Sequence, residues 1–162
     1  MKAIQFKQTT VKDIYVSILT KRFMTYDNGW MRWEPVEKKI EPTGSELMDR
    51  LAQALAKDCR LETSHFIAST GLNPNDFRVL FRLHTGLSLK EFIKEYQQMR
   101  ACEWLACTDL SYTEIAKRCG FASASSLSHY FRKSLRCTPT EYRHQHRPTN
   151  FRELYEWTID NG

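Results

Sequence analysis

The sequence has no long apolar run. A membrane-spanning helix needs roughly 18 consecutive apolar residues, and no stretch of the chain approaches that length. The N-terminus also lacks the apolar segment of a secretory signal. With 41% hydrophobic and 27% charged residues, the composition is that of an ordinary globular protein. These absences exclude a membrane protein, and we expect a cytoplasmic one.

Metal-binding and catalytic patterns are missing as well. None of the five cysteines stands near a histidine at the spacing of zinc ligands. Cys102 and Cys107 lie five positions apart in a helical pattern, so they do not share one helix face. No stretch combines paired carboxylates, a nucleophile with a histidine base, or a phosphate-binding glycine loop. We therefore expect reduced core thiols, no metal, no cofactor and no enzymatic activity.

Acidic residues are outnumbered by basic ones. Nineteen aspartates and glutamates stand against 24 lysines and arginines, which gives a formal net charge of +5. Such a charge suits a polyanionic partner, but it would equally suit many proteins that bind nothing acidic. Charge alone does not decide the function, so the sequence pattern has to.

We expect the chain to have three parts. Pro42 and Gly44 make a natural boundary, which leaves an extension over residues 1–44, a main domain over 45–147 and an amphipathic tail over 148–162. In the extension, apolar residues from Val11 to Phe23 fall on a single helical face, but the run IYVSIL would also suit a strand. The sequence is therefore compatible with either a helix or a small α/β cap in this extension. The tail predicts a short helix through Phe151, Leu154, Tyr155 and Ile159.

Helical patterns follow one another from Ser45 onwards. Asn73 before Pro74 is an N-cap with proline at the first helical position, and Ser111 with Glu114 is a capping box. These start signals predict an all-α main domain. The expected helices cover residues 45–57, 63–70, 74–84, 89–107, 111–118, 123–134 and 138–146.

One segment of this domain occurs twice. The run FIASTGLNPNDFRVLFRLHTGLSLKEF matches IAKRCGFASASSLSHYFRKSLRCTPTEY. The offset is 49 up to the turn, where Gly71 pairs with Gly120, and 50 after it, where Phe81 pairs with Phe131. Each copy has the organisation of a helix-turn-helix, whose second helix enters the major groove of DNA. We call the copies the first and second repeat.

The second helix of each repeat has an apolar stripe opposite a polar one. The apolar stripes, expected to be buried, include Leu80 in the first repeat and Leu135 in the second. A merely solvated face would be the better interpretation of a single polar stripe. The polar stripe recurs, however, and the stripe carries no acidic residue in either repeat, whereas solvated helices usually mix both signs. The candidate DNA-binding residues are Asn75, Arg78, Val79, Arg82, Ser125, Ser128, His129, Arg132 and Lys133.

The two repeats also carry the similarity to a known family. The run TDLSYTEIAKRCGFASASSLSHYFRKSLRCTPTEYR follows a TDxSIxEIAxxxGFxxxSxFSxxFKKxxGxTPxxYR pattern at most of its marked positions, and GLNPNDFRVLFRLHTGLSLKEFI is similar to GxSPxxLxRLFKxxTGxSxxxYL. Over residues 45–147 the chain thus resembles the AraC/XylS family of transcription regulators. The resemblance implies two helix-turn-helix subdomains joined by a long central helix, with two recognition helices in successive major grooves.

The sequence departs from the family pattern at several positions. Val79 stands where the family very often has arginine, Gln97 where arginine is common, and Arg136 where glycine is common. Ile67 replaces a common alanine. We do not expect the larger ligand-binding domain of many members in this sequence, because the 44 preceding residues cannot make a cupin-type barrel, although they could make a small cap.

The first recognition helix has the more selective chemistry. Arg78 can pair bidentately with guanine O6 and N7, although a phosphate or solvent contact is the alternative. Asn75 could contact adenine or phosphate. Arg82, one turn further on, is expected to bind phosphate, as is Arg132 in the second repeat.

The second recognition helix carries fewer side chains that can distinguish one base from another. Ser125 and Ser128 discriminate bases poorly, and His129 could donate to guanine or to phosphate. We therefore expect loose selectivity there. A basic cluster formed by Arg143, His144, His146 and Arg147 would contact phosphate or simply end a solvated helix.

The leading interpretation is a transcription regulator that binds double-stranded DNA in a sequence-specific manner as a monomer, with RNA polymerase as a second candidate partner. Two alternatives stay open. One is an architectural or mobile-element factor that bends DNA, and the other is a C-terminal fragment of a larger effector-responsive regulator.

Overall fold

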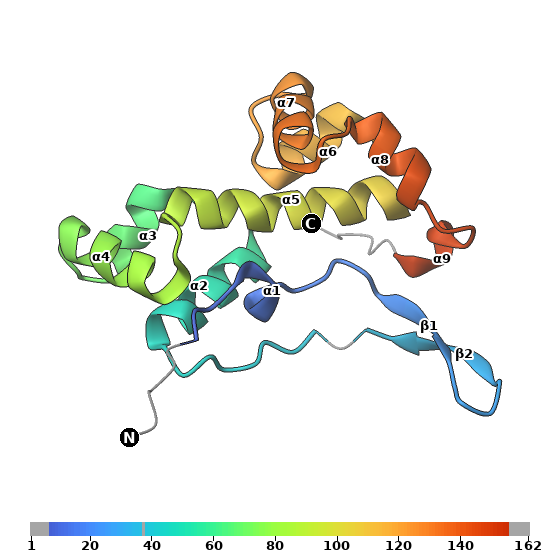
Figure 1. Cartoon of the computed structure of the whole chain (residues 1–162), viewed down its shortest axis with the longest axis horizontal. Helices are drawn as coiled ribbons and strands as arrows, with labels where there is room; N and C mark the ends of the chain where they lie inside the picture. The colour runs from blue at the N-terminus through green and yellow to red at the C-terminus, as the bar shows by residue number, and fades with distance from the viewer. Residues whose placement is uncertain (1–6, 37, 156–162) are drawn as a thin grey trace, which may run out of the picture. The chain divides into compact units, whose positions relative to one another are not determined.

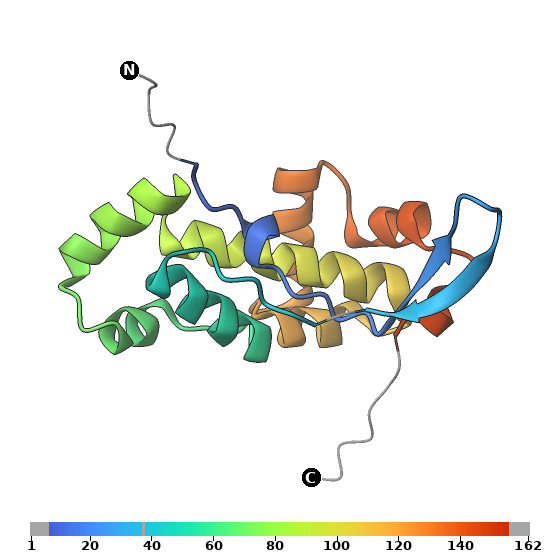
Figure 2. The same ribbon diagram turned by 90° about the horizontal axis from the view of Figure 1, so that it is seen from below.

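The computed structural model describes residues 7–36 and 38–155, which contain nine helices and one two-stranded sheet (Figure 1). The described residues form two units. Unit 1 comprises residues 7–16 and 40–97, and unit 2 comprises 17–36, 38–39 and 98–155. One helix, α5 (Leu89–Cys107), is continuous through both, as Figures 1 and 2 show. The predicted all-α main domain is confirmed.

Unit 1 contains four helices and the first half of α5. Polar caps fix where the helices begin: Ser45 Oγ accepts a hydrogen bond from Met48 N at 3.4 Å, and Asn73 Oδ1 accepts one from Asn75 N at 2.9 Å. Gly86 ends α4 in the left-handed conformation, at φ 75°. The four helices are α1 (Val11–Ile14), α2 (Glu46–Lys57), α3 (Thr63–Ser69) and α4 (Pro74–Thr85).

Four phenylalanine rings form the centre of unit 1. Phe77 and Phe81, on one side of α4, stack with their centroids 5.5 Å apart. Phe66 meets Phe77 edge-on at 6.1 Å, and Phe92 meets Phe81 edge-on at 5.5 Å. Burying each ring stabilises the fold by about 2 to 3 kcal/mol. Because this side of α4 is locked into the core, its opposite side faces solvent.

Unit 2 repeats this construction around the second half of α5. Ser111 Oγ, Ser123 Oγ and Thr138 Oγ1 each accept a hydrogen bond, at 3.1 Å, from the backbone N–H three residues on. Leu127 and Phe131 are fully buried in its core. The helices are α6 (Tyr112–Cys119), α7 (Ala124–Leu135), α8 (Pro139–His146) and α9 (Phe151–Leu154). Ile159, the last residue of the predicted tail helix, lies outside the described residues.

The extension before Ser45 is less helical than its spacing predicts. The apolar face from Val11 towards Phe23 becomes a helix only as far as Ile14. The reason is that these apolar residues have different neighbours: Val11 and Ile14 are buried in unit 1, whereas Ile18 joins the core of unit 2.

The rest of the extension includes a β-hairpin in unit 2. β1 (Lys21–Thr25) pairs antiparallel with β2 (Met31–Pro35), with Lys21 opposite Pro35 and Thr25 opposite Met31. A turn at residues 27–29 connects them, and Gly29 adopts φ 83° there. Within residues 7–36 and 38–155, no helix is both long enough and apolar enough to cross a membrane.

Candidate nucleic-acid interface

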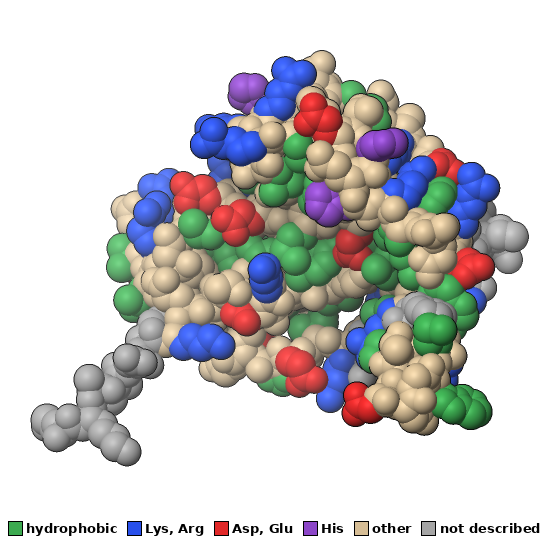
Figure 3. Space-filling view, turned by 45° about the vertical axis from the view of Figure 1, so that its right-hand side comes forward, with side chains coloured by type: hydrophobic (Ala, Val, Ile, Leu, Met, Phe, Trp, Pro, Cys, Tyr) green, Lys and Arg blue, Asp and Glu red, His purple; other side chains and the backbone are tan. Residues whose placement is uncertain are grey.

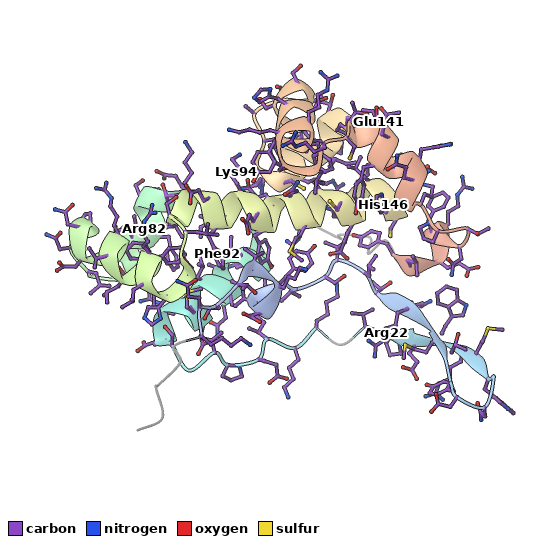
Figure 4. All side chains as sticks on the ribbon, in the orientation of Figure 1. Arg22, Arg82, Phe92, Lys94, Glu141 and His146 are labelled. Carbon is purple, nitrogen blue, oxygen red and sulfur yellow. The ribbon has the colours of Figure 1, made fainter. Side chains whose placement is uncertain are left out.

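In unit 1 the exposed side of α4 carries the predicted first DNA-binding face. Asn75, Arg78, Val79 and Arg82 are all exposed, and Arg82 is labelled on this helix in Figure 4. The only acidic residue of α4, Asp76, lies about 100° round the helix from Asn75, at the border of the face. The face itself therefore combines two guanidinium groups, one amide and one apolar side chain.

A hollow of about 300 Å³ adjoins this face in unit 1. Its cationic lining is Arg78 and Arg82 from α4 and Lys90 from the first turn of α5, and the hydroxyls of Thr63 and Ser88 line it as well. Lysine and arginine side chains at the start of a helix suit an anion, because the backbone N–H groups there add partial positive charge. The hollow thus has two guanidinium groups and one ammonium group in its lining, beside the predicted base-contacting surface.

The equivalent surface of unit 2 lies on α7. Ser125, His129, Arg132 and Lys133 are exposed, and Ser128 is half-buried. α7 contains no acidic residue. Figure 3 shows lysine, arginine and histidine side chains gathered at the top of the view, where α7 lies in Figure 1. This face is positive but carries fewer groups that discriminate between bases.

The apolar stripes behind both faces are narrower than predicted. Leu80 is 38% exposed and Leu135 is 39% exposed, so neither is a core residue. Each lies at the edge of its stripe, where the neighbouring helices do not reach. Exposure of Leu80 adds apolar surface to α4, next to the predicted DNA face.

Two members of the predicted basic cluster on α8 have a structural task instead. Arg143 donates hydrogen bonds from Nε to Leu105 O at 2.9 Å and from a terminal nitrogen to Leu110 O at 2.7 Å. Arg147 donates to Leu105 O at 3.3 Å and to Thr108 O. Both side chains are therefore held by backbone carbonyls rather than simply solvated, and phosphate contact by the cluster stays a prediction. Of the cluster, only His144 and His146 remain exposed.

A sequence signal for this task exists. α5 ends at Cys107, and neither Thr108 nor Asp109 is a glycine that could fold back to satisfy the last carbonyls. Those carbonyls need donors from elsewhere in the chain. Two arginines four residues apart supply them: Arg143 on α8 and Arg147 directly after it.

The cysteines do not form a metal or redox centre in the part of the chain that the structure describes. No group of three potential metal ligands occurs there, and all five cysteines are free thiols. Burial raises the pKa of Cys102 and of Cys107 to about 11. Both remain protonated near neutral pH and are therefore poor nucleophiles.

Comparison with known proteins agrees with this geometry. A helix-turn-helix domain family matches residues 66–145, from Phe66 in α3 to Gln145 in α8, and so includes both repeats. The HTH-type transcriptional activator RhaR of Mannheimia succiniciproducens is 32% identical over 107 residues, which are 65% of this chain and 36% of that protein. The chain thus spans about a third of the length of this relative.

Solved structures show the same architecture. The DNA-binding domain of AdpA, determined in complex with a target DNA, is 28% identical with a TM-score of 0.57, and the match covers 61% of this chain and 90% of that one. An AraC-type DNA-binding domain protein from Chromobacterium violaceum is 25% identical with a TM-score of 0.57, covering 64% and 94%. Fold and surface together define a double helix-turn-helix DNA-binding domain. Through this domain, the chain is similar to transcription regulators with an AraC-type DNA-binding domain.

Proposed function

We propose that the protein binds double-stranded DNA in a sequence-specific manner as a monomer, inserting α4 and α7 into successive major grooves, and that it regulates transcription by doing so. The observation that carries the proposal is the duplication. Two equivalent helices of one chain each expose a face with basic side chains and no carboxylate within it. Phosphates would repel carboxylates on such a face, whereas an ordinary solvated helix has no reason to exclude them.

In this proposal the residues of the α4 face divide between bases and backbone. Arg78 contacts a guanine, because its guanidinium can donate to O6 and N7 together. Asn75 contacts an adenine edge or a phosphate near the start of the helix. Arg82 binds a phosphate in the hollow that it lines with Lys90, which sets the register of the helix on DNA.

The α7 face contributes more affinity than selectivity. Arg132 and Lys133 bind phosphates, and their charge acts on every sequence alike. Ser125, Ser128 and His129 face the bases with groups that discriminate weakly. The preferred site is therefore asymmetric, with a strongly specified half under α4 and a loosely specified half under α7.

Two further assignments follow from a DNA target. We place the protein in the bacterial cytoplasm, where the chromosome lies, and assign it no catalytic role. RhaR of M. succiniciproducens is described as a transcriptional activator, which supports RNA polymerase as the second partner.

The experiment is a selection of bound duplexes from a random pool with the full chain. The expected result is one asymmetric motif whose two halves are one helical turn apart, bound at a ratio of one protein to one duplex. Fluorescence anisotropy on the selected duplex then compares Arg82→Ala with Lys57→Ala, an exposed lysine at the end of α2 that serves as the charge-matched control.

Three results would contradict parts of the proposal. A palindromic motif bound only by two chains would exclude the monomeric arrangement. Enrichment of bent or flexible duplexes without a base motif would favour the architectural alternative. No enrichment at all, with Arg82→Ala and Lys57→Ala equally neutral, would exclude α4 as a DNA-binding helix.

A further inference from the structure

Apolar side chains reach solvent in the middle of a basic surface in unit 1. On α4, Val79 is 70% exposed and Leu83 is 58% exposed. Val79 lies about 40° round the helix from Asn75, between the two arginines of the face and Leu83. A β-branched apolar residue at this place gains nothing from helix propensity, because valine is a poorer helix former than most residues. The exposed valine therefore has no local structural explanation.

The fold itself does not require this apolar surface. In α7, the residues at the equivalent positions of Val79 and Leu83 are His129 and Lys133, both polar and exposed. Their helix has the same capped start and the same buried stripe. The two repeats thus differ on the surface where they would contact DNA, and the first repeat has the apolar one.

We propose that Val79 contacts the C5-methyl group of a thymine, and so selects an A·T pair beside the guanine assigned to Arg78. The inference rests on the proposed function. The thymine methyl is the apolar group that the major groove displays, and small apolar side chains are the ones that recognise it. Val79 cannot donate a hydrogen bond, so it discriminates only through this methyl and through the water that it excludes.

The charges around Val79 favour DNA over a protein as the occupant. On the same helix Arg78 and Arg82 lie to one side of it and Asp76 to the other, and Lys90 joins the two arginines in the adjoining hollow. A protein partner that covered Val79 with an apolar surface would also need acidic groups to neutralise these cations. Duplex DNA supplies both an apolar contact and negative charge, because the thymine methyl groups lie within the major groove and the phosphates lie along its edges.

The expected size of the effect follows from one methyl group. Burying one methyl group on binding, so that it no longer contacts water, strengthens the binding constant about fourfold. Replacing the contacted thymine by deoxyuridine should therefore weaken binding about fourfold. Val79→Ala removes the two methyls of the valine and should lose at least that factor. The two losses should not multiply, since each change destroys the same contact.

The test is a cycle of protein and DNA changes, measured by fluorescence anisotropy with the full chain. Each thymine of the selected duplex is replaced in turn by deoxyuridine, and binding of the wild type and of Val79→Ala is compared. Val79→Ala should remove the deoxyuridine effect at one position and at no other. Leu72→Ala is the matched control, because Leu72 is also an exposed apolar residue, 37% exposed, but precedes α4 in the turn.

A gain-of-contact arm uses 5-methylcytosine. If cytosine replaces the sensitive thymine and guanine replaces its adenine partner, methylation of that cytosine at C5 restores a methyl at the same place in the groove. The methylation should recover part of the affinity of the wild type but none of that of Val79→Ala. A deoxyuridine effect that is absent, or that persists unchanged in Val79→Ala, would overturn the inference while leaving the proposed function intact. Failure of the wild type to prefer any duplex would overturn the proposed function, and the inference with it.

Discussion

Arg143 on α8 donates a hydrogen bond from its Nε to the backbone carbonyl oxygen of Leu105, 2.9 Å away, in the last turns of α5. A second bond, to Leu110 O, extends the same guanidinium to the loop that follows. Burial lowers the pKa of Arg143, yet an arginine stays charged at any physiological pH. One side chain thus ties α8 to the end of α5.

Loss of this tie should destabilise the protein. Arg143→Met keeps much of the apolar stem but leaves Leu110 O without its charged donor and Leu105 O with the longer bond from Arg147 alone. Hydrogen bonds to charged groups contribute about 1.5 to 3 kcal/mol each. We expect the free energy of unfolding, measured by urea denaturation, to fall by about 2 to 4 kcal/mol. His144→Ala, at the exposed neighbouring position, should change it by less than about 0.5 kcal/mol. Equal midpoints for the two variants would contradict the assignment.

Replacing Arg136 should have the opposite effect. Arg136 ends α7 in the left-handed conformation, at φ 60° and ψ 24°, where Gly86 stands in the first repeat. A non-glycine residue pays about 1 to 2 kcal/mol for this conformation, partly offset by the greater freedom of glycine in the unfolded chain. Arg136→Gly should raise the free energy of unfolding by about 0.5 to 1 kcal/mol. A lower urea midpoint would show that the arginine makes a contact worth more than the strain.

DNA binding should depend steeply on salt. If Arg82, Arg132 and Lys133 each displace about one counterion, the plot of log affinity against log salt concentration should have a slope near about −3. Titrations at several potassium chloride concentrations measure it. Arg132→Ala should make the slope less negative by about one, on every duplex alike. A slope near zero would exclude phosphate binding as the main source of affinity.

Arg78→Ala should act on selectivity instead. A bidentate contact to guanine discriminates by about 1 to 3 kcal/mol, so the variant should lose that much on the selected duplex and little on a duplex with the guanine replaced. Comparative titration of the two duplexes checks this. An equal loss on both would assign Arg78 to a phosphate, beside Arg82 in the hollow that both residues line.

The buried thiols should make stability fall at alkaline pH. Burial raises the pKa of Cys102 and Cys107 from 9.0 to about 11, so the folded protein holds these protons more tightly than the unfolded chain does. Stability is therefore unaffected by the thiols below about pH 9 and declines as pH rises towards 11. Urea midpoints of the wild type and of Cys107→Ala at pH 8.0 and pH 10.5, two illustrative conditions about the unperturbed pKa, test this. The wild type should lose more on going to the higher pH, and an identical pH dependence would contradict the role of Cys107.

Elements with marked ends could be predicted from the sequence. Asn73, Ser111 and Gly86 specify their helix boundaries through local hydrogen bonds and backbone conformation, so no tertiary information is needed. The exposed faces of α4 and α7 followed because the apolar stripe of each helix is strongly periodic.

The remaining features depend on neighbours that the sequence does not identify. The spacing of Val11 and Ile14 with Ile18 suits a helix, but periodicity cannot tell that the first two and the third enter different cores. Arg143 resembles any basic residue near a helix end until α5 lies beside it. Leu80 fits an apolar stripe by angle, and only the packing shows that the stripe ends before it.

The duplication described above has a consequence for how binding preference can change over time. In a symmetric dimer, a substitution alters both copies of the recognition helix at once, so both halves of a palindromic target must change together. Here α4 and α7 are encoded separately, and their outward residues already differ at the positions of Val79 and His129. In the proposed binding mode, a mutation in one recognition helix leaves the DNA contacts of the other unchanged. The protein can thus acquire a new half-site without passing through a form that binds neither.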